Sequence, residues 1–197
     1  MLKPYLNIGV TECGTDEAGR GCLSGGVCAA AVILPFDFKD SELNDSKQLS
    51  EKKRQRLRAT IESNAVAYAV AFATNEEIDR LNILHASILA MNRAVKQLSV
   101  RPEFLLVDGN RFYTDTGIAF KTIVKGDATF MSIAAASVLA KTYRDAAMEE
   151  LDRLYPQYNW RKNKGYPTKD HRQAIEKYGI TPYHRKSFTL LKEATLF

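Results

Sequence analysis

The sequence has few of the features that mark an exported, membrane-spanning or zinc-binding protein. Only three cysteines occur in 197 residues, at Cys13, Cys22 and Cys28, and no two of them form a CxxC pair. Such a set provides neither a disulfide framework nor a structural zinc site, so we expect reduced thiols. No apolar run approaches the length of a membrane span, and residues 1–12 lack the apolar core of a signal peptide. We therefore expect a cytoplasmic protein without membrane contact.

Internal repeats, low-complexity tracts and linkers rich in glycine or serine are also missing. The three histidines have no metal-ligand spacing, so we assign them no catalysis and expect them on helix surfaces or at helix caps. The composition is that of a folded chain, with 45% hydrophobic and 26% charged residues. A chain of this length predicts a single globular domain over residues 1–197, which we expect to be a monomer.

Positive charge is concentrated at one end of the chain, whose net charge is +5. Residues 153–192 contain ten Lys or Arg against two acids, a local net charge of +8. The rest of the chain is slightly acidic. This distribution favours a polyphosphate partner, although a solvated basic surface would give the same pattern. We interpret residues 153–197 as a basic, helical C-terminal segment of the domain.

The hydrophobic pattern predicts an α/β fold. Apolar runs bounded by Gly, Pro or Asp predict strands at about 6–15, 27–34, 65–73, 104–107 and 120–124. Helical patterns cover about 50–64, 76–98 with a break near Asn82, 132–155 and 169–178. Because helical sequence separates the last two strands from the first three, we expect a mixed sheet with crossover helices.

Four acids stand where predicted strands give way to loops: Asp16 and Glu17 after the first strand, Asp108 after the fourth and Asp127 after the fifth. If those strands are neighbours, the four carboxylates converge. Clustered carboxylates stay ionised only around a cation, and oxygen ligands select Mg²⁺ or Mn²⁺. Two such ions can activate water and stabilise the leaving oxygen of a phosphodiester. A single acid before a glycine, such as Asp108, is more typical of a turn, and the spacing alone does not indicate a nuclease.

Two short motifs are candidates for substrate contacts. Gly19-Arg20-Gly21 follows the first two acids, and its glycines allow backbone N–H groups to approach an anion or a sugar. Tyr166 lies in the basic segment beside Lys164, where an aromatic ring can stack on a sugar or base. Each motif also has an ordinary structural interpretation, as a glycine-rich turn and as loop packing before Pro167.

Seven segments that cover nearly the whole chain form a further pattern: TDEAGRGCLSGGVCAAAVILP at 15–35, NDSKQLSEKKR at 44–54, NILHASILAMNRAV at 82–95, LLVDGN at 105–110, KGDATFMSIAAASVLAKTYRD at 125–145, NKGYPTKDH at 163–171 and HRKSF at 184–188. Taken together and in this order, they resemble ribonuclease HII, the type 2 ribonuclease H family.

The resemblance implies a ribonuclease H-like fold, with a five-stranded mixed sheet flanked by helices and a C-terminal helical segment that helps to grip a duplex. It also implies roles for particular residues. The catalytic, metal-binding acids would be Asp16, Glu17, Asp108 and Asp127. The groups that sense a ribose 2′-hydroxyl would be Gly19, Arg20 and Gly21. Tyr166 would stack on the sugar at the junction between a ribonucleotide and the DNA that follows it. Candidate phosphate contacts are Lys47, Lys164 and Arg185.

The implied activity is that of an endonuclease that hydrolyses the RNA strand of RNA–DNA hybrids with two Mg²⁺ or Mn²⁺ ions. It would also cut on the 5′ side of single ribonucleotides embedded in duplex DNA, leave 3′-hydroxyl and 5′-phosphate ends, and so remove misincorporated ribonucleotides. Two alternatives remain open. One is the sister family ribonuclease HIII, which prefers continuous RNA in a hybrid. The other is a catalytically silent hybrid-binding module.

The sequence departs from the family pattern at two places. It has GCLSGGV at 21–27 where GPLAGPV is closer to expectation, and Asn163 where the family usually has a histidine. The first departure puts the thiol of Cys22 beside the sensing loop. Neither departure removes a residue assigned to metal or sugar, so the activity is expected and the fine specificity is less determined.

Overall fold

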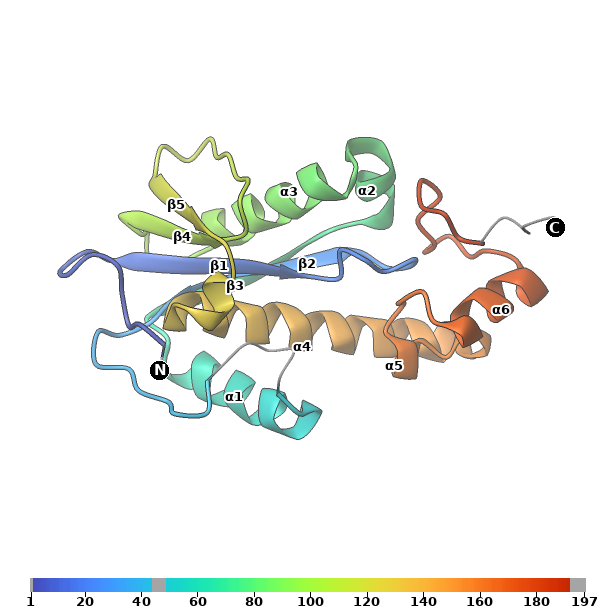
Figure 1. The fold of residues 1–197 in the computed structure, drawn as a ribbon, viewed down its shortest axis with the longest axis horizontal. Coiled ribbons are helices and arrows are strands. Elements are labelled where there is room, and N and C mark those ends of the chain that lie inside the picture. The colour runs from blue at the N-terminus through green and yellow to red at the C-terminus, as the bar shows by residue number, and fades with distance from the viewer. Residues whose placement is uncertain (1, 44–48, 192–197) are drawn as a thin grey trace.

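A five-stranded mixed sheet forms the centre of the molecule in the computed structural model, which describes residues 2–43 and 49–191 (Figure 1). The strands stand in the order β3-β2-β1-β4-β5. Their bounds are Glu12–Ala18 for β1, Val27–Ile33 for β2, Ala67–Ala73 for β3, Phe104–Asp108 for β4 and Ala119–Ile123 for β5. The strand β1 pairs antiparallel with β2 and parallel with β4, and therefore occupies the middle of the sheet.

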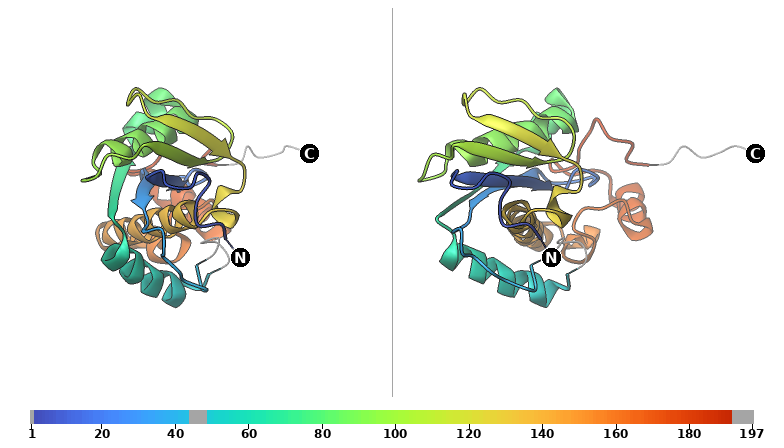
Figure 2. Two further views of the ribbon diagram at one scale, coloured as in Figure 1. Left: turned by 90° about the vertical axis from the view of Figure 1, so that its left-hand side faces the viewer. Right: turned by 60° about the vertical axis from the view of Figure 1, so that its left-hand side comes forward.

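Helices cover both faces of the sheet. The helix α3 packs on one face and α4 on the other, while α1 lies outside α4 (Figure 2). The helical bounds are Glu51–Asn64 for α1, Asn75–Leu81 for α2, Ile83–Lys96 for α3, Met131–Leu154 for α4, Trp160–Asn163 for α5 and Lys169–Tyr178 for α6, with short 3₁₀ turns at Gly126–Ala128 (η1) and Pro156–Tyr158 (η2). Among the described residues, no helix has the length and apolar character needed to cross a membrane.

The strand β2 shows why the sequence pattern is continuous rather than alternating. Val27 and Ala29 pack in the core on the α3 side, whereas Ala30 and Val32 pack in the core on the α4 side. A strand covered by helices on both faces has no polar face, so every position is apolar. The predicted mixed sheet with flanking helices is confirmed.

The start of α4 lies directly against β1. A Cβ added to Gly14 would collide with the backbone of Ser132, so only glycine permits this approach. Side chains two residues apart point to the same face of a strand, and Asp16 therefore shares the α4 face with Gly14. The contact places the first turns of α4 beside the acidic end of β1.

The C-terminal segment packs against the last turns of α4, at the right in Figure 1. Its core joins Trp160 of α5 and Ile175 of α6 to Met148 of α4 and to Leu23, which lies between β1 and β2. The indole N–H of the buried Trp160 donates to His171 Nε2 over 3.0 Å. His171 and His184 are both fully buried, so the expectation that they lie on helix surfaces is wrong.

Several predicted boundaries shift in the structure. The first strand begins at Glu12 rather than near residue 6, because the backbone N–H groups of Leu6 and Asn7 donate to the Glu12 carboxylate and fold this stretch into a turn. The break near Asn82 is confirmed: its φ is 66°, and its side chain caps α3 by accepting from the N–H of Leu84. The short helix α5 was not predicted.

Candidate active site

Two of the four acids are held side by side by the parallel pairing of β1 and β4. Thr15 pairs with Val107, so the next residues, Asp16 and Asp108, follow in register on neighbouring strands. The prediction that Asp16 and Glu17 follow the first strand needs a small correction, because β1 extends through both of them to Ala18. They are thus fixed by strand geometry rather than by a loop.

Asp127 reaches the same end of the sheet through the turn η1. It is buried, and it follows Gly126, whose backbone N–H donates to Asp108 Oδ1 over 2.7 Å. This bond ties η1 to the last residue of β4. The structure thus places the residue that precedes Asp127 against the Asp108 carboxylate.

Burial and mutual repulsion perturb the acids on β1. Burial raises the pKa of Asp16 well above its usual value, and the nearby charges of Glu17 and Asp108 raise it further. The side chain of Ser137 on α4 and the backbone N–H of Glu17, whose bond to Asp16 Oδ1 is 2.7 Å long, act in the opposite direction. Burial also raises the pKa of Glu17, against the lowering effect of Arg20, whose Nη1 lies 3.1 Å from Glu17 Oε1.

The donor set fits a hard divalent cation. Within residues 2–43 and 49–191, the structure places no three His, Cys, Asp or Glu side chains close enough together to hold a metal ion. The acids nevertheless offer only oxygen ligands, and burial, together with repulsion from Asp108, raises the pKa of both Asp16 and Glu17. A divalent cation would relieve that repulsion, which is the physical reason for the fit.

The Gly19-Arg20-Gly21 loop leaves β1 immediately beside these acids. Gly19 has a φ of +100°, and an added Cβ would collide with the Arg144 side chain. A Cβ on Gly21 would meet nothing within 4 Å. The Arg20 side chain is 51% exposed. The loop therefore has an inner side fixed by packing and an outer side open to a ligand.

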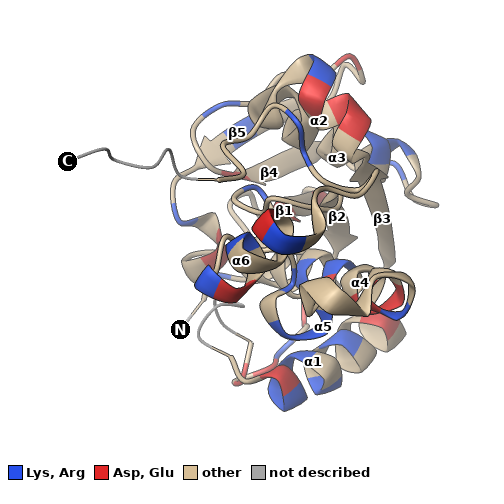
Figure 3. Ribbon diagram, turned by 90° about the vertical axis from the view of Figure 1, so that its right-hand side faces the viewer, with Lys and Arg blue, Asp and Glu red and all other residues tan. Residues whose placement is uncertain are grey.

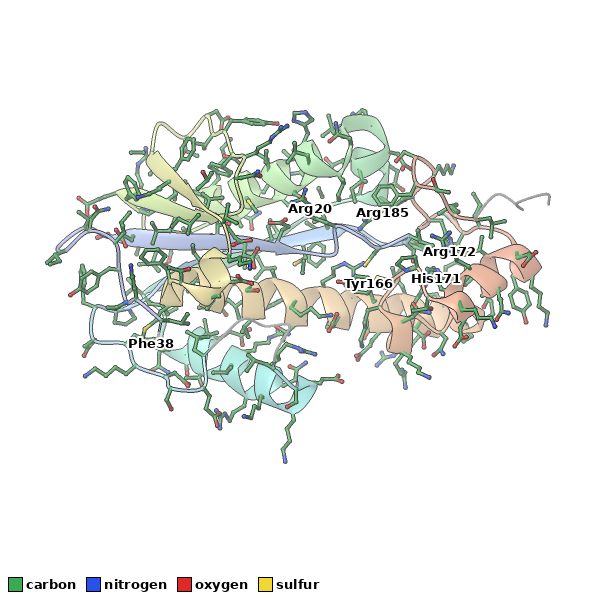
Figure 4. All side chains as sticks on the ribbon, in the orientation of Figure 1. Arg20, Phe38, Tyr166, His171, Arg172 and Arg185 are labelled. Carbon is green, nitrogen blue, oxygen red and sulfur yellow. The ribbon has the colours of Figure 1, made fainter. Side chains whose placement is uncertain are left out.

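Tyr166 lies on a second loop that touches the first. The N–H of Leu23 donates to the carbonyl of Gly165 over 2.8 Å, and the Cys22 thiol lies 3.5 Å from the carbonyl oxygen of Lys164. Tyr166 is 40% exposed, and the Lys141 ammonium lies 5.9 Å from the centroid of its ring. Figure 4 shows Arg20 and Tyr166 near the C-terminal end of β1 and the N-terminal end of β2. An exposed ring beside the glycine loop is available for stacking.

The three residues predicted to contact phosphate differ in their surroundings. Lys47 lies outside the described residues. The Lys164 ammonium lies 2.6 Å from Glu149 Oε1, and its side chain is only 13% exposed. Arg185 is fully buried and donates to four backbone carbonyls, so its assignment to phosphate is corrected: in this structure its guanidinium faces the protein interior.

Sequence reasoning missed the contribution of α4 to the site. Ser137 interacts with Asp16, Lys141 lies over the Tyr166 ring, and Arg144 donates to the carbonyls of Ser24, Gly26 and Lys164. The signal was the spacing of polar residues three or four apart within an otherwise apolar helix, which marks one face. Without the fold, nothing indicated that this face meets the acids and both loops.

Comparisons with known proteins agree with this arrangement. The family model described as Ribonuclease HII matches residues 13–191. Ribonuclease HII of Parabacteroides distasonis is 64% identical over 193 residues, which cover 98% of this chain and 97% of the relative. Ribonuclease HII of Bacteroides thetaiotaomicron is 61% identical over 196 residues, which cover 100% of this chain and 98% of the relative.

Two solved structures establish the fold. The ribonuclease H2 of Pyrococcus horikoshii OT3 matches with a TM-score of 0.76 at 24% identity, over 91% of this chain and 94% of that chain. The Mn²⁺ complex of Bst-RNase HIII matches with a TM-score of 0.74 at 19% identity, over 92% of this chain and 68% of that chain. The predicted ribonuclease H-like fold is confirmed. With its family model matched over most of the sequence and full-length relatives above 60% identity, the chain belongs to the ribonuclease HII family and is a ribonuclease H endonuclease.

Proposed function

We propose that this enzyme cuts on the 5′ side of a ribonucleotide embedded in duplex DNA, and hydrolyses the RNA strand of continuous hybrids at the same site. The products would carry 3′-hydroxyl and 5′-phosphate ends, and the biological task would be the removal of misincorporated ribonucleotides. The observation that carries the proposal is the placement of Asp16, Glu17 and Asp108 next to the Gly19-Arg20-Gly21 loop, with the exposed Tyr166 ring on the adjoining loop.

Asp16, Glu17, Asp108 and Asp127 would hold two divalent ions, Mg²⁺ or Mn²⁺. When bound, these ions would supply an activated water and stabilise the departing 3′-oxygen. Ser137 and the N–H of Glu17 hold the Asp16 carboxylate, and the N–H of Gly126 holds that of Asp108, so both acids keep a fixed direction. Fixed ligands reduce the reorganisation that the reaction requires.

Selectivity for a ribonucleotide would come from contacts to the sugars, because contacts to phosphates do not distinguish RNA from DNA. Backbone groups of the Gly19-Arg20-Gly21 loop would bond the ribose 2′-hydroxyl. The Tyr166 ring would pack on the following sugar only where that sugar has no 2′-hydroxyl. The open space around Gly21 and the exposure of the Tyr166 ring support these roles. The cleavage polarity rests on the family resemblance.

The family assignment decides between the two alternatives left open by the sequence. It favours ribonuclease HII over HIII, and an enzyme over a silent binding module. A single domain that includes residues 153–197, a monomeric state and a cytoplasmic location stay predictions. The packing of Trp160 and Ile175 against Met148 and Leu23 supports the first of these.

The test is to map the cut in a DNA duplex with one embedded ribonucleotide, in Mg²⁺, in Mn²⁺ and with chelator. We expect one metal-dependent cut on the 5′ side. Asp108→Asn should lower the rate by about three orders of magnitude, because metal stabilisation is worth several kcal/mol, while the protein stays folded. Near-normal turnover of that variant, or a cut in chelator, would remove the two-metal interpretation.

A further inference from the structure

Two buried arginines meet beneath the glycine loop. Arg144 of α4 is 1% exposed, and Arg185, which follows α6, is 0% exposed. Arg144 donates to the carbonyls of Ser24, Gly26 and Lys164 over 2.8–3.1 Å. Arg185 donates to the carbonyls of Gly19, Arg20, Gly25 and Gly26 over 2.7–3.2 Å. All of these acceptors are backbone oxygens of the two loops that flank the acids.

In the described part of the chain, neither Arg144 nor Arg185 forms a salt bridge with a carboxylate. Burial, and then the charge of Arg144, lower the pKa of Arg185 to about 10, so it stays protonated at neutral pH. A buried charge without a counter-ion is costly, and such groups are more often found at sites of function than in plain cores. The carbonyl dipoles are its compensation.

The hydrogen bonds of Arg185 decide which way two peptide groups face. In a trans peptide, the carbonyl of one residue and the N–H of the next point in opposite directions. Because Arg185 holds the carbonyls of Gly19 and Arg20 inward, the N–H groups of Arg20 and Gly21 point away from the guanidinium. Among the described residues, neither N–H has a hydrogen-bond partner. Two donors are thus left on the outer side of the loop.

Arg144 connects this loop to the one that carries Tyr166. Its Nη1 reaches the Lys164 carbonyl, two residues before Tyr166, while its Nη2 and Nε hold Ser24 and Gly26. Its side chain also occupies the space where a side chain at position 19 would lie. The two arginines therefore tie the outward N–H groups and the tyrosine ring into one unit.

We propose that Arg185 is a positioning residue for ribonucleotide recognition: together with Arg144 it turns the N–H groups of Arg20 and Gly21 outward to receive the sugar, without touching substrate. The inference rests on the proposed function of the loop. It replaces the phosphate contact predicted for Arg185 with an indirect role. Figure 4 shows Arg185 close to Arg20, whereas Arg172 of the same C-terminal segment lies farther from Arg20.

The experiment compares Arg185→Lys and Arg185→Met with the parent. Lysine keeps the charge but not the planar fork that reaches several carbonyls, and methionine removes the charge as well. We expect the ratio of metal-free affinities for a single-ribonucleotide duplex and an all-DNA duplex to fall roughly 10- to 100-fold, because only the first duplex offers the 2′-hydroxyl that these N–H groups would bond. Parent-like ratios in folded variants would overturn the proposal.

Arg93→Lys is the matched control. Arg93 also reaches a backbone carbonyl, that of Phe72, and bonds the Glu77 carboxylate over 2.7 Å, but it belongs to α3 and not to either loop. This variant should lose stability and keep the parent's substrate ratio. A similar fall in the ratio would show a general effect of instability and would also overturn the proposal.

A measurement on the parent needs no variant to fold. In ¹⁵N-labelled protein, the backbone amide resonances of Arg20 and Gly21 should shift with the single-ribonucleotide duplex and much less with the all-DNA duplex. The Gly117 amide should respond to neither. Equal shifts of Arg20 and Gly21 with both duplexes would contradict the proposal. If the parent does not cut the ribonucleotide duplex at all, the proposed function fails instead.

Discussion

Gly19 and Gly21 lie two residues apart, yet only one of them is required by the fold. At Gly19 a side chain would meet both an unfavourable φ of +100° and the Arg144 side chain, whereas at Gly21 it would enter open space. Gly19→Ala should therefore lower the free energy of unfolding by about 2–4 kcal/mol, from backbone strain and overpacking together. Urea denaturation measures this loss.

Gly21→Ala provides the contrast at the same scale. Its stability should stay within about 0.5 kcal/mol of the parent, as for an ordinary surface change, while cutting at a single ribonucleotide falls. A variant that is as active as the parent would show that substrate does not approach this position closely. Loss of stability equal to that of Gly19→Ala would show that the loop is packed on both sides.

Tyr166→Ala tests the ring itself. Stacking on a base is typically worth about 1–3 kcal/mol, so we expect cutting at a single ribonucleotide to fall by about 5- to 150-fold, with a smaller loss of duplex binding. Tyr166→Phe keeps the ring and should be milder. Rates of both variants on the single-ribonucleotide duplex and on a continuous hybrid are the measurement. If Tyr166→Ala cuts the first substrate as fast as the parent, the tyrosine only packs the loop.

The candidate residues were predictable from the sequence to unequal degrees. The acids lie at strand ends, which hydrophobic patterning locates well, and parallel pairing then brings Asp16 and Asp108 together. Arg185 was misassigned because an arginine in a basic segment is expected to face solvent. Only the fold shows that backbone carbonyls surround it.

At the scale of elements, the C-terminal segment carries charge of both signs. Figure 3 shows Lys and Arg on α5 and α6, with acids also present on α6. Of the basic residues here, Lys162 and Lys169 are exposed, whereas Arg185 is not. The sequence predicts a local excess of positive charge, and in the structure part of this charge is buried, as at Arg185.

Replacement of Lys162 and Lys169 by alanine tests whether α5 and α6 hold phosphates. If both bind phosphate, the slope of log affinity against log salt should become shallower by about 0.9 for each lost contact. Arg101→Ala is the control, because it is exposed and precedes β4, at the other end of that strand from Asp108. An unchanged slope in the double variant would mean that the segment is a solvated surface.

The elements themselves were largely predictable, and the failures have local causes. Long periodic helices such as α4 were located within one residue at each end. The start of β1 was wrong because apolar residues before it belong to a turn capped by the Glu12 carboxylate. The four-residue helix α5 is too short to show a period and is held by burial of Trp160.

For the whole molecule, buried histidines predict sensitivity to mild acid. Burial, and then the charge of His171, lower the pKa of His184 from 6.5 to about 4. The unfolded chain therefore takes up a proton below pH 6.5 while the folded chain does not, so stability falls as the pH drops from 6.5 towards 4. We expect His184 to contribute a loss of about 1–2 kcal/mol between pH 7 and pH 5, measured by urea denaturation as the difference between the parent and a His184 variant, because the raised pKa values of Asp16 and Glu17 act in the opposite direction in both proteins.

His184→Asn supplies the control, since its side-chain oxygen can still accept from the N–H of Thr181, which lies 2.9 Å from His184 Nδ1. The variant should be less stable at pH 7 but less dependent on pH above 5. The carboxylate of Glu77, whose pKa its bond to Arg93 lowers to about 2, loses its contribution only below about pH 4.5 and so does not interfere. A parent-like pH slope in the variant would contradict the assignment.

The helix α4 sets the distance between the acids and the two loops that carry Gly19-Arg20-Gly21 and Tyr166. Along its 24 residues, Ser137 meets an acid, Lys141 meets the tyrosine ring and Arg144 holds both loops. One residue inserted between Ser137 and Arg144 would rotate every later contact by about 100° and advance it by about 1.5 Å. An insertion or deletion in this stretch of α4 would therefore separate the acids from the two loops assigned to sugar recognition. Surface loops of the enzyme, by contrast, can vary in length.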